Sequence, residues 1–304
     1  MTKRSIIAAV FTVVYLAMTL GVIGWRSDHL SMVILVVAMI ILDTRTYEIV
    51  IVLSPFALFW VSYDFLGAFP NYLFSPVHVS DLYQAEIKLF GIPSSDGLIT
   101  LCEWFQSRTH DLLSLFAGGS YILWMPAPMT YAIYLYARRR NEVVRFGYTF
   151  LLANLIGYIC YYSFPAAPPW YYINYGPVMD TSVPGSEGLL SEFDRIIGIP
   201  VFRSIYAKGG NPFAAIPSLH SAYPMVGLLT AVRLRQPGWI VFFVVLSVGT
   251  WFAAVYSQHH YVIDVLLGII CAILSYAFMI ILRRMSVYRS FEQLLLREVQ
   301  AGAE

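Results

Sequence analysis

Charged residues are scarce in this chain. They make up 12% of its 304 residues, against roughly a quarter in an average soluble domain. The formal net charge at pH 7 is only +1, so no general positive charge indicates nucleic-acid binding. Hydrophobic residues make up 59% of the chain and occur in long runs. This composition excludes an ordinary soluble enzyme and indicates a protein that crosses a membrane several times.

Cysteine is rare as well, and its spacing carries no pattern. The chain has three cysteines, an odd number spread over separate segments, which excludes a disulfide framework and a cysteine metal site. No cluster of carboxylates and histidines suits a metal ion either, since several histidines stand apart in different loops: His29, His78 and His110. We therefore expect neither a metal nor another cofactor. An internal repeat, which marks many transporters, is also missing.

Long apolar runs predict the fold, because a helix needs about 20 apolar residues to cross a bilayer. The sequence offers about eight such segments: 5–24, 29–43, 47–65, 112–137, 143–164, 217–233, 239–257 and 261–282. The first is long for a signal peptide and lacks a good cleavage site, so we interpret it as an uncleaved span. The second is short and would be tilted, paired closely with the third, or re-entrant. The predicted fold class is all-α, a polytopic membrane helical bundle of about six to eight transmembrane helices.

Lysine and arginine positions predict the orientation, because these residues concentrate in cytoplasmic loops. Successive spans cross the membrane in opposite directions. With the spans counted in this way, the basic residues that flank them fall on one side of the membrane: Lys3, Arg4, Arg45, Arg138, Arg139, Arg140, Arg145, Arg233, Arg235, Arg283 and Arg284. Both termini would then be cytoplasmic. We expect a single integral membrane domain with N-terminal spans at 1–65, an outer loop at 66–111, catalytic core spans at 112–282 and a cytoplasmic tail at 283–304.

The two long loops expected on the outer side differ in composition. In residues 77–92 of the first loop, apolar residues alternate with Asp81, Gln84, Glu86 and Lys88 in a partly helical pattern. This pattern fits an amphipathic helix lying on the membrane surface. The second loop is rich in proline, glycine and tyrosine, and its tyrosine and tryptophan side chains suit the membrane interface.

Two short stretches place histidines at the outer ends of apolar runs. PSLH at 217–220 puts His220 at the start of the sixth predicted span, and HHYVID at 259–264 puts His260 between the seventh and the eighth. His260 and Asp264 are spaced i, i+4, so on a helix the carboxylate would accept the proton of one ring nitrogen and leave the other nitrogen free to attack. Such a pair alone fits a structural role, a proton pathway or catalysis. Because both stretches lie at the same membrane depth, we predict one catalytic site.

Several stretches resemble a known family. PSLH together with HHYVID resembles the type 2 phosphatidic acid phosphatase superfamily, and three longer stretches resemble its inositol phosphorylceramide synthase branch: FPAAPPWYY at 164–172, GGNPFAAIPSLHSAYP at 209–224 and AVYSQHHYVID at 254–264. The segment at 77–92 resembles that branch more diffusely. The resemblance implies that His260 is the nucleophile on a phosphoester, that Asp264 orients it and that His220 donates a proton. It also implies a phosphotransferase with phosphatidylinositol as donor and ceramide as acceptor.

The chain departs from the superfamily pattern where the phosphate would bind. That pattern has Lys and Arg before a Pro in its first motif and an Arg ahead of the last His, whereas the stretch before Pro168 has neither and position 254 is Ala. The phosphate would need other cations, and Arg203 and Lys208 are the nearest candidates in the sequence. Arg195 and Arg108 are weaker ones.

Other residues would complete the substrate site. Ser218 and the start of its helix would add hydrogen-bond donors for an anion. Trp170 and Tyr171 would help cover the site, because a transferase must exclude water while it admits a lipid alcohol. Asn211 would contact the hydroxyl groups of inositol.

The residues by themselves reach only lipid phosphoester transfer or hydrolysis, and other functions stay open. A lipid phosphate or polyprenyl pyrophosphate phosphatase would use the same histidines and need no acceptor lipid. A proton-coupled transporter would spread polar residues across the membrane depth, whereas these spans are apolar through their middles. A membrane scaffold would not need a buried Asp264. The site would face outward from a bacterial inner membrane, which the short termini favour, or into the Golgi lumen of a eukaryote.

Overall fold

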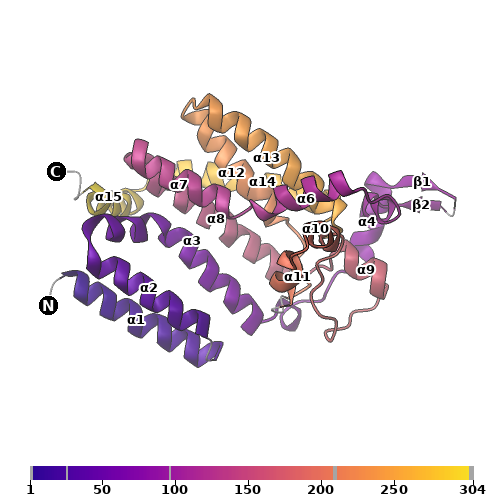
Figure 1. Ribbon diagram of the computed structural model, residues 1–304, viewed down its shortest axis with the longest axis horizontal. Coiled ribbons are helices and arrows are strands. Elements are labelled where there is room, and N and C mark those ends of the chain that lie inside the picture. Colours follow the sequence, from indigo (N-terminus) through magenta and orange to yellow (C-terminus); the bar gives the residue numbers. More distant parts are fainter. Residues whose placement is uncertain (1–2, 25–26, 96, 208–210, 301–304) are drawn as a thin grey trace. The chain divides into compact units, whose positions relative to one another are not determined.

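The structure is a computed structural model that describes four stretches of the chain: residues 3–24, 27–95, 97–207 and 211–300. Helices make up nearly all of its regular structure, which confirms the all-α prediction (Figure 1). In these stretches the strands form one hairpin, β1 (Ile92–Ser94) antiparallel to β2 (Gly97–Ile99), and one 3-10 turn, η1 (Asn71–Leu73), precedes it.

Five described helices are long and apolar enough to cross a membrane: α1 (Lys3–Val22), α3 (Thr44–Ala68), α8 (Arg140–Ser163), α13 (Pro237–Tyr256) and α14 (Val262–Leu282). The helices α6 (Asp111–Ile122) and α7 (Pro126–Arg138) make a sixth span if they are counted as one segment bent by 47°. Pro126 begins α7 at this bend, where its missing N–H removes no helical hydrogen bond. The chain is therefore a multi-pass integral membrane protein.

Two predicted spans are shorter than a bilayer requires. Residues 29–43 correspond to α2 (Ser27–Leu42), with 16 residues, and residues 217–233 to α12 (Leu219–Arg233), with 15 residues. A helix of that length is roughly 22 Å long, against about 30 Å for the hydrocarbon layer. In α12, nine residues are buried. Its apolar character therefore reflects packing against other helices, which hydropathy alone does not distinguish from contact with lipid.

Shorter helices complete the described chain: α4 (Ser80–Phe90), α5 (Leu101–Gln106), α9 (Pro169–Tyr175), α10 (Leu190–Ile197), α11 (Val201–Tyr206) and α15 (Ser286–Gln300). The helix predicted within residues 77–92 is present as α4.

Contacts divide the chain into two compact units. Unit 1 comprises Met1–Phe69, Met129–Leu151 and Met279–Glu304, and unit 2 comprises Pro70–Pro128 and Leu152–Phe278. Every predicted site residue that the structure describes falls in unit 2. The single integral membrane domain expected from the sequence stays a prediction.

Unit 1 packs aromatic rings and pairs its buried charges. Helix α2 packs against α1 and α3, and α15 packs against α3. The rings of Phe56 and Phe150 lie 4.6 Å apart, centre to centre. The buried carboxylate of Glu48 accepts a hydrogen bond from the Tyr136 hydroxyl and lies 3.6 Å from the Arg140 guanidinium. These partners offset the cost of burying the charge.

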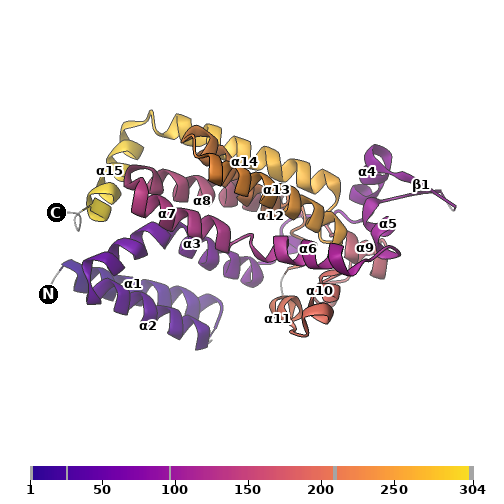
Figure 2. The same ribbon diagram turned by 45° about the horizontal axis from the view of Figure 1, so that its top comes forward.

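Helices α12, α13 and α14 run alongside one another in unit 2 (Figures 1 and 2). Glycine allows two close approaches in this unit. A Cβ at Gly227 of α12 would lie 2.4 Å from the Phe243 ring of α13, and a Cβ at Gly118 of α6 would lie 2.2 Å from the Phe193 ring of α10. A larger residue at either glycine would force the paired helices apart.

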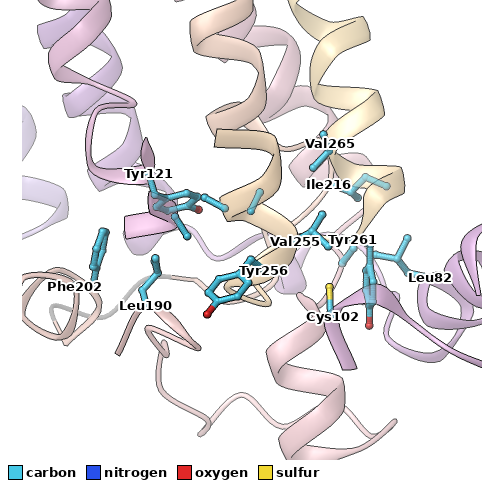
Figure 3. Packing of buried hydrophobic residues seen from close by; sticks show 14 residues of the cluster. Leu82, Cys102, Tyr121, Leu190, Phe202, Ile216, Val255, Tyr256, Tyr261 and Val265 are labelled. Carbon is cyan, nitrogen blue, oxygen red and sulfur yellow. The ribbon is translucent and has the colours of Figure 1, made fainter. Parts of the chain in front are cut away.

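A cluster of buried apolar side chains forms the core of unit 2 (Figure 3). It runs from Tyr121 and Leu190 on one side to Leu82 and Tyr261 on the other. Residues of α13 and of the turn that follows it supply its centre. The histidines of HHYVID are thus attached to a packed core, which limits their motion.

Candidate active site

The turn that carries His259 and His260 joins the end of α13 to the start of α14. The N–H groups of both histidines donate to the Ala254 carbonyl, at 3.1 and 3.0 Å. Gln258 has a φ of 66°, which reverses the chain within a few residues. The two bonds to Ala254 satisfy its carbonyl near the end of α13 and hold the histidines against that helix.

The PSLH stretch is bonded backbone to backbone with this second motif. The Ser218 N–H donates to the Asp264 carbonyl at 2.9 Å. A Cβ at Gly268 of α14 would lie 2.1 Å from the Ser218 carbonyl, so glycine permits this approach. Ser218 also caps α12, since its hydroxyl oxygen accepts from the Ser221 N–H at 3.4 Å. His220 follows in the first turn of α12.

The two imidazole rings expected to share a site do lie together. The centres of the His220 and His260 rings are 5.7 Å apart, and the ring planes are tilted by 52°. His260 is buried and His220 is partly exposed.

The partner of His260 differs from the one expected. Its Nδ1–H donates to the Ala215 carbonyl at 2.9 Å, whereas Oδ2 of Asp264 lies 3.6 Å from Nδ1, beyond a hydrogen bond. A carbonyl only accepts, so Nδ1 carries the proton and Nε2 has the free lone pair. His260 therefore has the predicted tautomer, but the group that fixes it is the Ala215 backbone carbonyl. Asp264 is a nearby charged residue and not the hydrogen-bond acceptor.

Asp264 itself is fully buried in the first turn of α14. Its Oδ2 accepts from the Tyr261 N–H at 2.9 Å, and its Oδ1 has no hydrogen-bond partner among the described residues. The helix N-terminus favours a negative charge at this position. The spacing of His260 and Asp264 thus places them together as predicted, at one end of α14.

Three stretches noted in the sequence hold the Ala215 carbonyl in place. Their backbones run side by side through the parallel bridges of His78 with Ala166 and of Ala166 with Ala214. The Ala166 N–H donates to the Phe213 carbonyl at 2.9 Å, and the Ala215 N–H donates to the Ala166 carbonyl at 3.3 Å. The acceptor for His260 is therefore part of an ordered backbone layer.

The charge states of the two adjacent histidines follow from their burial. Burial lowers the pKa of His260 to about 4, partly opposed by its bond to Ala215. Burial, with the nearby His260, lowers the pKa of His259 to about 3. Both rings are neutral near pH 7, which is the state in which an imidazole nitrogen can attack.

His259 is held by packing. Its ring is stacked between those of Tyr121, at 5.7 Å, and Tyr206, at 4.6 Å, measured centre to centre, and its Nε2–H donates to the Glu187 carbonyl at 3.1 Å. Both faces and one nitrogen are therefore engaged. This arrangement distinguishes His259 from His260, which the sequence alone does not do.

Two aromatic residues of unit 2 that sequence reasoning missed surround His220. Tyr121 of α6 stacks on the His220 ring at 4.6 Å, and Trp124 lies edge-on to it at 5.1 Å. In the sequence both belong to an apolar run, where an aromatic residue gives no signal of a site. The stack Tyr206–His259–Tyr121–His220 restricts both imidazoles through ring contacts.

Of the predicted phosphate ligands, Arg203 is described and Lys208 lies outside the described residues. Arg203 is exposed in α11, one turn before Tyr206, which stacks on His259. The Arg203 guanidinium makes no ion pair with the described residues. The guanidinium of Arg195, by contrast, is paired with Glu192 and Asp111. Arg195 is thus already engaged by two carboxylates, whereas the guanidinium of Arg203 is paired with none among the described residues.

The other predicted substrate residues are engaged within the protein. Trp170 is buried and its backbone N–H donates to the Gln258 carbonyl at 2.9 Å, and Tyr171 is buried with its hydroxyl donating to the Val178 carbonyl at 3.1 Å. The amide nitrogen of Asn211 donates to Asn71, and its oxygen accepts from the Phe213 N–H at 3.0 Å. These contacts hold loops beside the histidines, and direct contact with a substrate stays a prediction.

Within the described ranges, no three His, Cys, Asp or Glu side chains are grouped so that they could hold a metal ion.

Comparison with known families covers this site. Residues 98–278, more than half of the chain, match the family model described as the PAP2 superfamily. The chain belongs to the PAP2 superfamily. In this PAP2 superfamily member the matched region contains both histidine motifs and Asp264.

Curated relatives of this PAP2 superfamily protein have related names. The chain is 42% identical over 281 residues to the phosphoinositol dihydroceramide synthase of Bacteroides thetaiotaomicron, covering 91% of each chain. It is 31% identical over 225 residues to the inositol phosphorylceramide synthase catalytic subunit of Saccharomyces cerevisiae, covering 71% of this chain and 52% of the relative. It is 27% identical over 203 residues to the inositol phosphorylceramide synthase of Candida albicans. The resemblance to the synthase branch is thereby confirmed, while no solved structure gives a significant match.

Proposed function

We propose that the protein is a membrane phosphotransferase that moves phosphoinositol from phosphatidylinositol to ceramide or dihydroceramide and makes inositol phosphorylceramide. Support for the substrates comes from the Bacteroides relative, named phosphoinositol dihydroceramide synthase, which is similar over 91% of both chains. The observation that carries the reaction type is the pair of imidazoles, His220 and His260, with ring centres 5.7 Å apart.

In the first half-reaction, Nε2 of His260 attacks the phosphorus of phosphatidylinositol. A P–N bond forms, and the P–O bond to diacylglycerol breaks. His220 gives its proton to the departing oxygen, and the negative phosphodiester favours that proton on His220 before the attack. Diacylglycerol leaves into the lipid, and a phosphohistidine that carries inositol remains.

In the second half-reaction, the primary hydroxyl of ceramide binds where the diacylglycerol oxygen left. His220, now neutral, takes the hydroxyl proton as the oxygen attacks phosphorus. The P–O bond to ceramide forms, the P–N bond to His260 breaks, and both histidines return to their starting states. Asp264 stabilises the positive charge that His260 carries while it is phosphorylated.

The phosphoryl oxygens need positive charge or donors in both steps. Arg203 supplies a guanidinium from α11, and Lys208 a second cation from the segment that follows. The N-terminus of α12 adds backbone donors next to His220. The rings of Tyr121 and Trp124 exclude water from one side of the site.

The site would face outward from a bacterial inner membrane, with both termini in the cytoplasm. The distribution of arginine and lysine supports this orientation, and the Bacteroides relative supports a bacterial setting.

The function is tested with purified full-length protein and phosphatidylinositol labelled in the inositol ring. Labelled inositol phosphorylceramide that forms only when ceramide is added supports the transferase. Labelled inositol phosphate that forms without ceramide would instead identify a hydrolase with the same histidines. Omission of each lipid in turn is the control.

The pH dependence of this reaction follows from the low pKa of His260. We expect kcat/KM to persist through pH 6.5, the ordinary value of histidine, and to fall only as the pH drops through about 4, because protonated His260 cannot attack. The measurement is a kcat/KM profile in mixed vesicles, with return to pH 7 as a control for reversibility. An acid limb centred near 6.5 would show that burial does not lower the pKa of the attacking imidazole.

A further inference from the structure

The start of α14, directly after His260, is capped by a residue from a distant part of the chain. The first N–H groups of a helix have no partner within it. Here the N–H groups of Val262 and Ile263 donate to Oε1 and Oε2 of Glu86, at 3.0 and 3.2 Å. Glu86 belongs to α4, far earlier in the sequence. One carboxylate thus holds two backbone groups that adjoin the predicted nucleophile.

The burial of Glu86 is unusual for its helix. Asp81, Gln84 and Lys88 of α4 are exposed, whereas Glu86 is 0% exposed. Burial raises the pKa of the Glu86 carboxyl, and the two N–H bonds oppose this rise by stabilising the anion. A buried carboxylate is costly unless it is bonded, and bonds to a charged acceptor at a helix N-terminus are among the stronger ones.

Glu86 and Asp264 share the capping of α14. The residue before the helix is Tyr261, which has no short side-chain acceptor for the usual N-terminal cap. Asp264 accepts from the Tyr261 N–H, and Glu86 accepts from the next two. Without Glu86, those two N–H groups would offer Asp264 alternative donors and draw its carboxylate away from His260.

Neighbouring contacts reinforce this attachment of α4 and α5 to the turn that carries His259 and His260. The thiol of Cys102 in α5 donates to the His260 carbonyl at 3.5 Å, and the Gln258 amide donates to the Cys102 carbonyl at 3.3 Å. Leu82, one turn before Glu86 on the same face of α4, is buried in the apolar cluster with Tyr261 (Figure 3). The face of α4 that carries Leu82 and Glu86 is therefore fitted to the turn.

We propose that Glu86 is a positioning residue for the transfer reaction. Glu86 holds the first turn of α14 from α4. In this way it keeps the His260 ring oriented toward the phosphorus and keeps Asp264 beside His260. No atom of Glu86 touches the reacting groups. The activity part of this proposal rests on the proposed function, while its structural part does not.

Glu86→Gln is the direct test, because the amide replaces one accepting oxygen with a donor that opposes a backbone N–H. We expect kcat to fall about 10- to 100-fold, since small displacements of a reacting group cost that much. KM for phosphatidylinositol and for ceramide should change less than about twofold, because no substrate contact is removed. Glu86→Asp keeps the negative charge on a shorter side chain. Its kcat should lie between those of Glu86→Gln and the unaltered protein.

Glu48→Gln is the matched control. Glu48 is also 0% exposed, but it belongs to unit 1, where its carboxylate accepts from the Tyr136 hydroxyl of α7 and lies 3.6 Å from the Arg140 guanidinium of α8. Glu48→Gln should lower the melting temperature while kcat stays within about twofold. If Glu48→Gln lowers kcat as much as Glu86→Gln for the same loss of melting temperature, Glu86 only stabilises the fold, and the proposal is wrong.

Hydrogen exchange of the backbone amides in residues 257–266 provides a readout without substrate. Exchange at Val262 and Ile263 should speed up in Glu86→Gln and stay unchanged in Glu48→Gln. Unchanged exchange together with unchanged kcat in Glu86→Gln would overturn the proposal. If the unaltered protein transfers no phosphoinositol, the proposed function fails, but the exchange result still decides whether Glu86 holds the turn.

Discussion

Replacing His260 with alanine is expected to abolish phosphoinositol transfer, with a loss on the order of 10⁴-fold or more. His260 has a ring nitrogen free for attack: its Nδ1–H is bonded to the Ala215 carbonyl at 2.9 Å, which leaves Nε2 with its lone pair. The measurement is ceramide-dependent formation of labelled product by purified protein. Size-exclusion profiles and melting temperatures confirm that the variant is folded.

The same variant tests the covalent intermediate. With donor lipid labelled in inositol and no ceramide, the unaltered protein should acquire label that is stable in base and lost in acid, as expected of a phosphohistidine. His260→Ala should acquire none. Turnover near normal in His260→Ala, or label retained on that variant, would show that the nucleophile is a different group.

His259 offers the matched control next door in the chain. His259→Phe keeps a ring between Tyr121 and Tyr206 and removes only the bond to the Glu187 carbonyl. Because one such bond contributes about 1 kcal/mol, activity should stay within about tenfold of normal. A loss as large as that of His260→Ala would mean that the two histidines cannot be assigned separate roles.

The fold could be predicted as far as hydropathy and helical spacing reach. Apolar runs identify α1, α3, α8, α13 and α14 as helices that can cross a membrane. They do not separate lipid-facing from protein-facing residues. Hydropathy therefore predicts α12 as a span, although it is only 15 residues long and nine of its residues are buried. A bend such as that between α6 and α7 also leaves the average hydropathy of a segment unchanged.

The site could be predicted where residues are close in sequence, and not where distant backbone groups meet. The i, i+4 spacing of His260 and Asp264 correctly predicts that they are neighbours, 3.6 Å apart, but the hydrogen bond expected between them is made to Ala215 instead. The hydrogen bond of His260 to Ala215 could not be predicted, because a backbone carbonyl has no sequence signature. Its charge predicts the polar face of α4 for Glu86, whereas the side chain is buried. Glu86 lies one turn after Leu82 and so continues the apolar stripe, and this spacing is the signal of its burial.

Replacing His220 with glutamine is expected to slow both half-reactions by about 10²- to 10⁴-fold, the usual contribution of a general acid and base. Glutamine keeps much of the volume between Tyr121 and Trp124, so the rings that pack on His220 stay in place. Rapid mixing measures the rate at which label joins the protein and, after addition of ceramide, the rate at which it leaves. Both rates should fall, and the label itself should still form.

A donor with a better leaving group separates the acid role of His220 from a role in binding. A 4-nitrophenyl ester of phosphoinositol releases a phenolate that needs no proton, so the first half-reaction of His220→Gln should recover to near the normal rate. Its second half-reaction should stay slow, because the ceramide hydroxyl still has no base to take its proton. His260→Ala should gain nothing from this donor, since the missing group is the nucleophile. If His220→Gln is equally slow with both donors, His220 acts by holding the substrate, and the proton must come from a different group at the site.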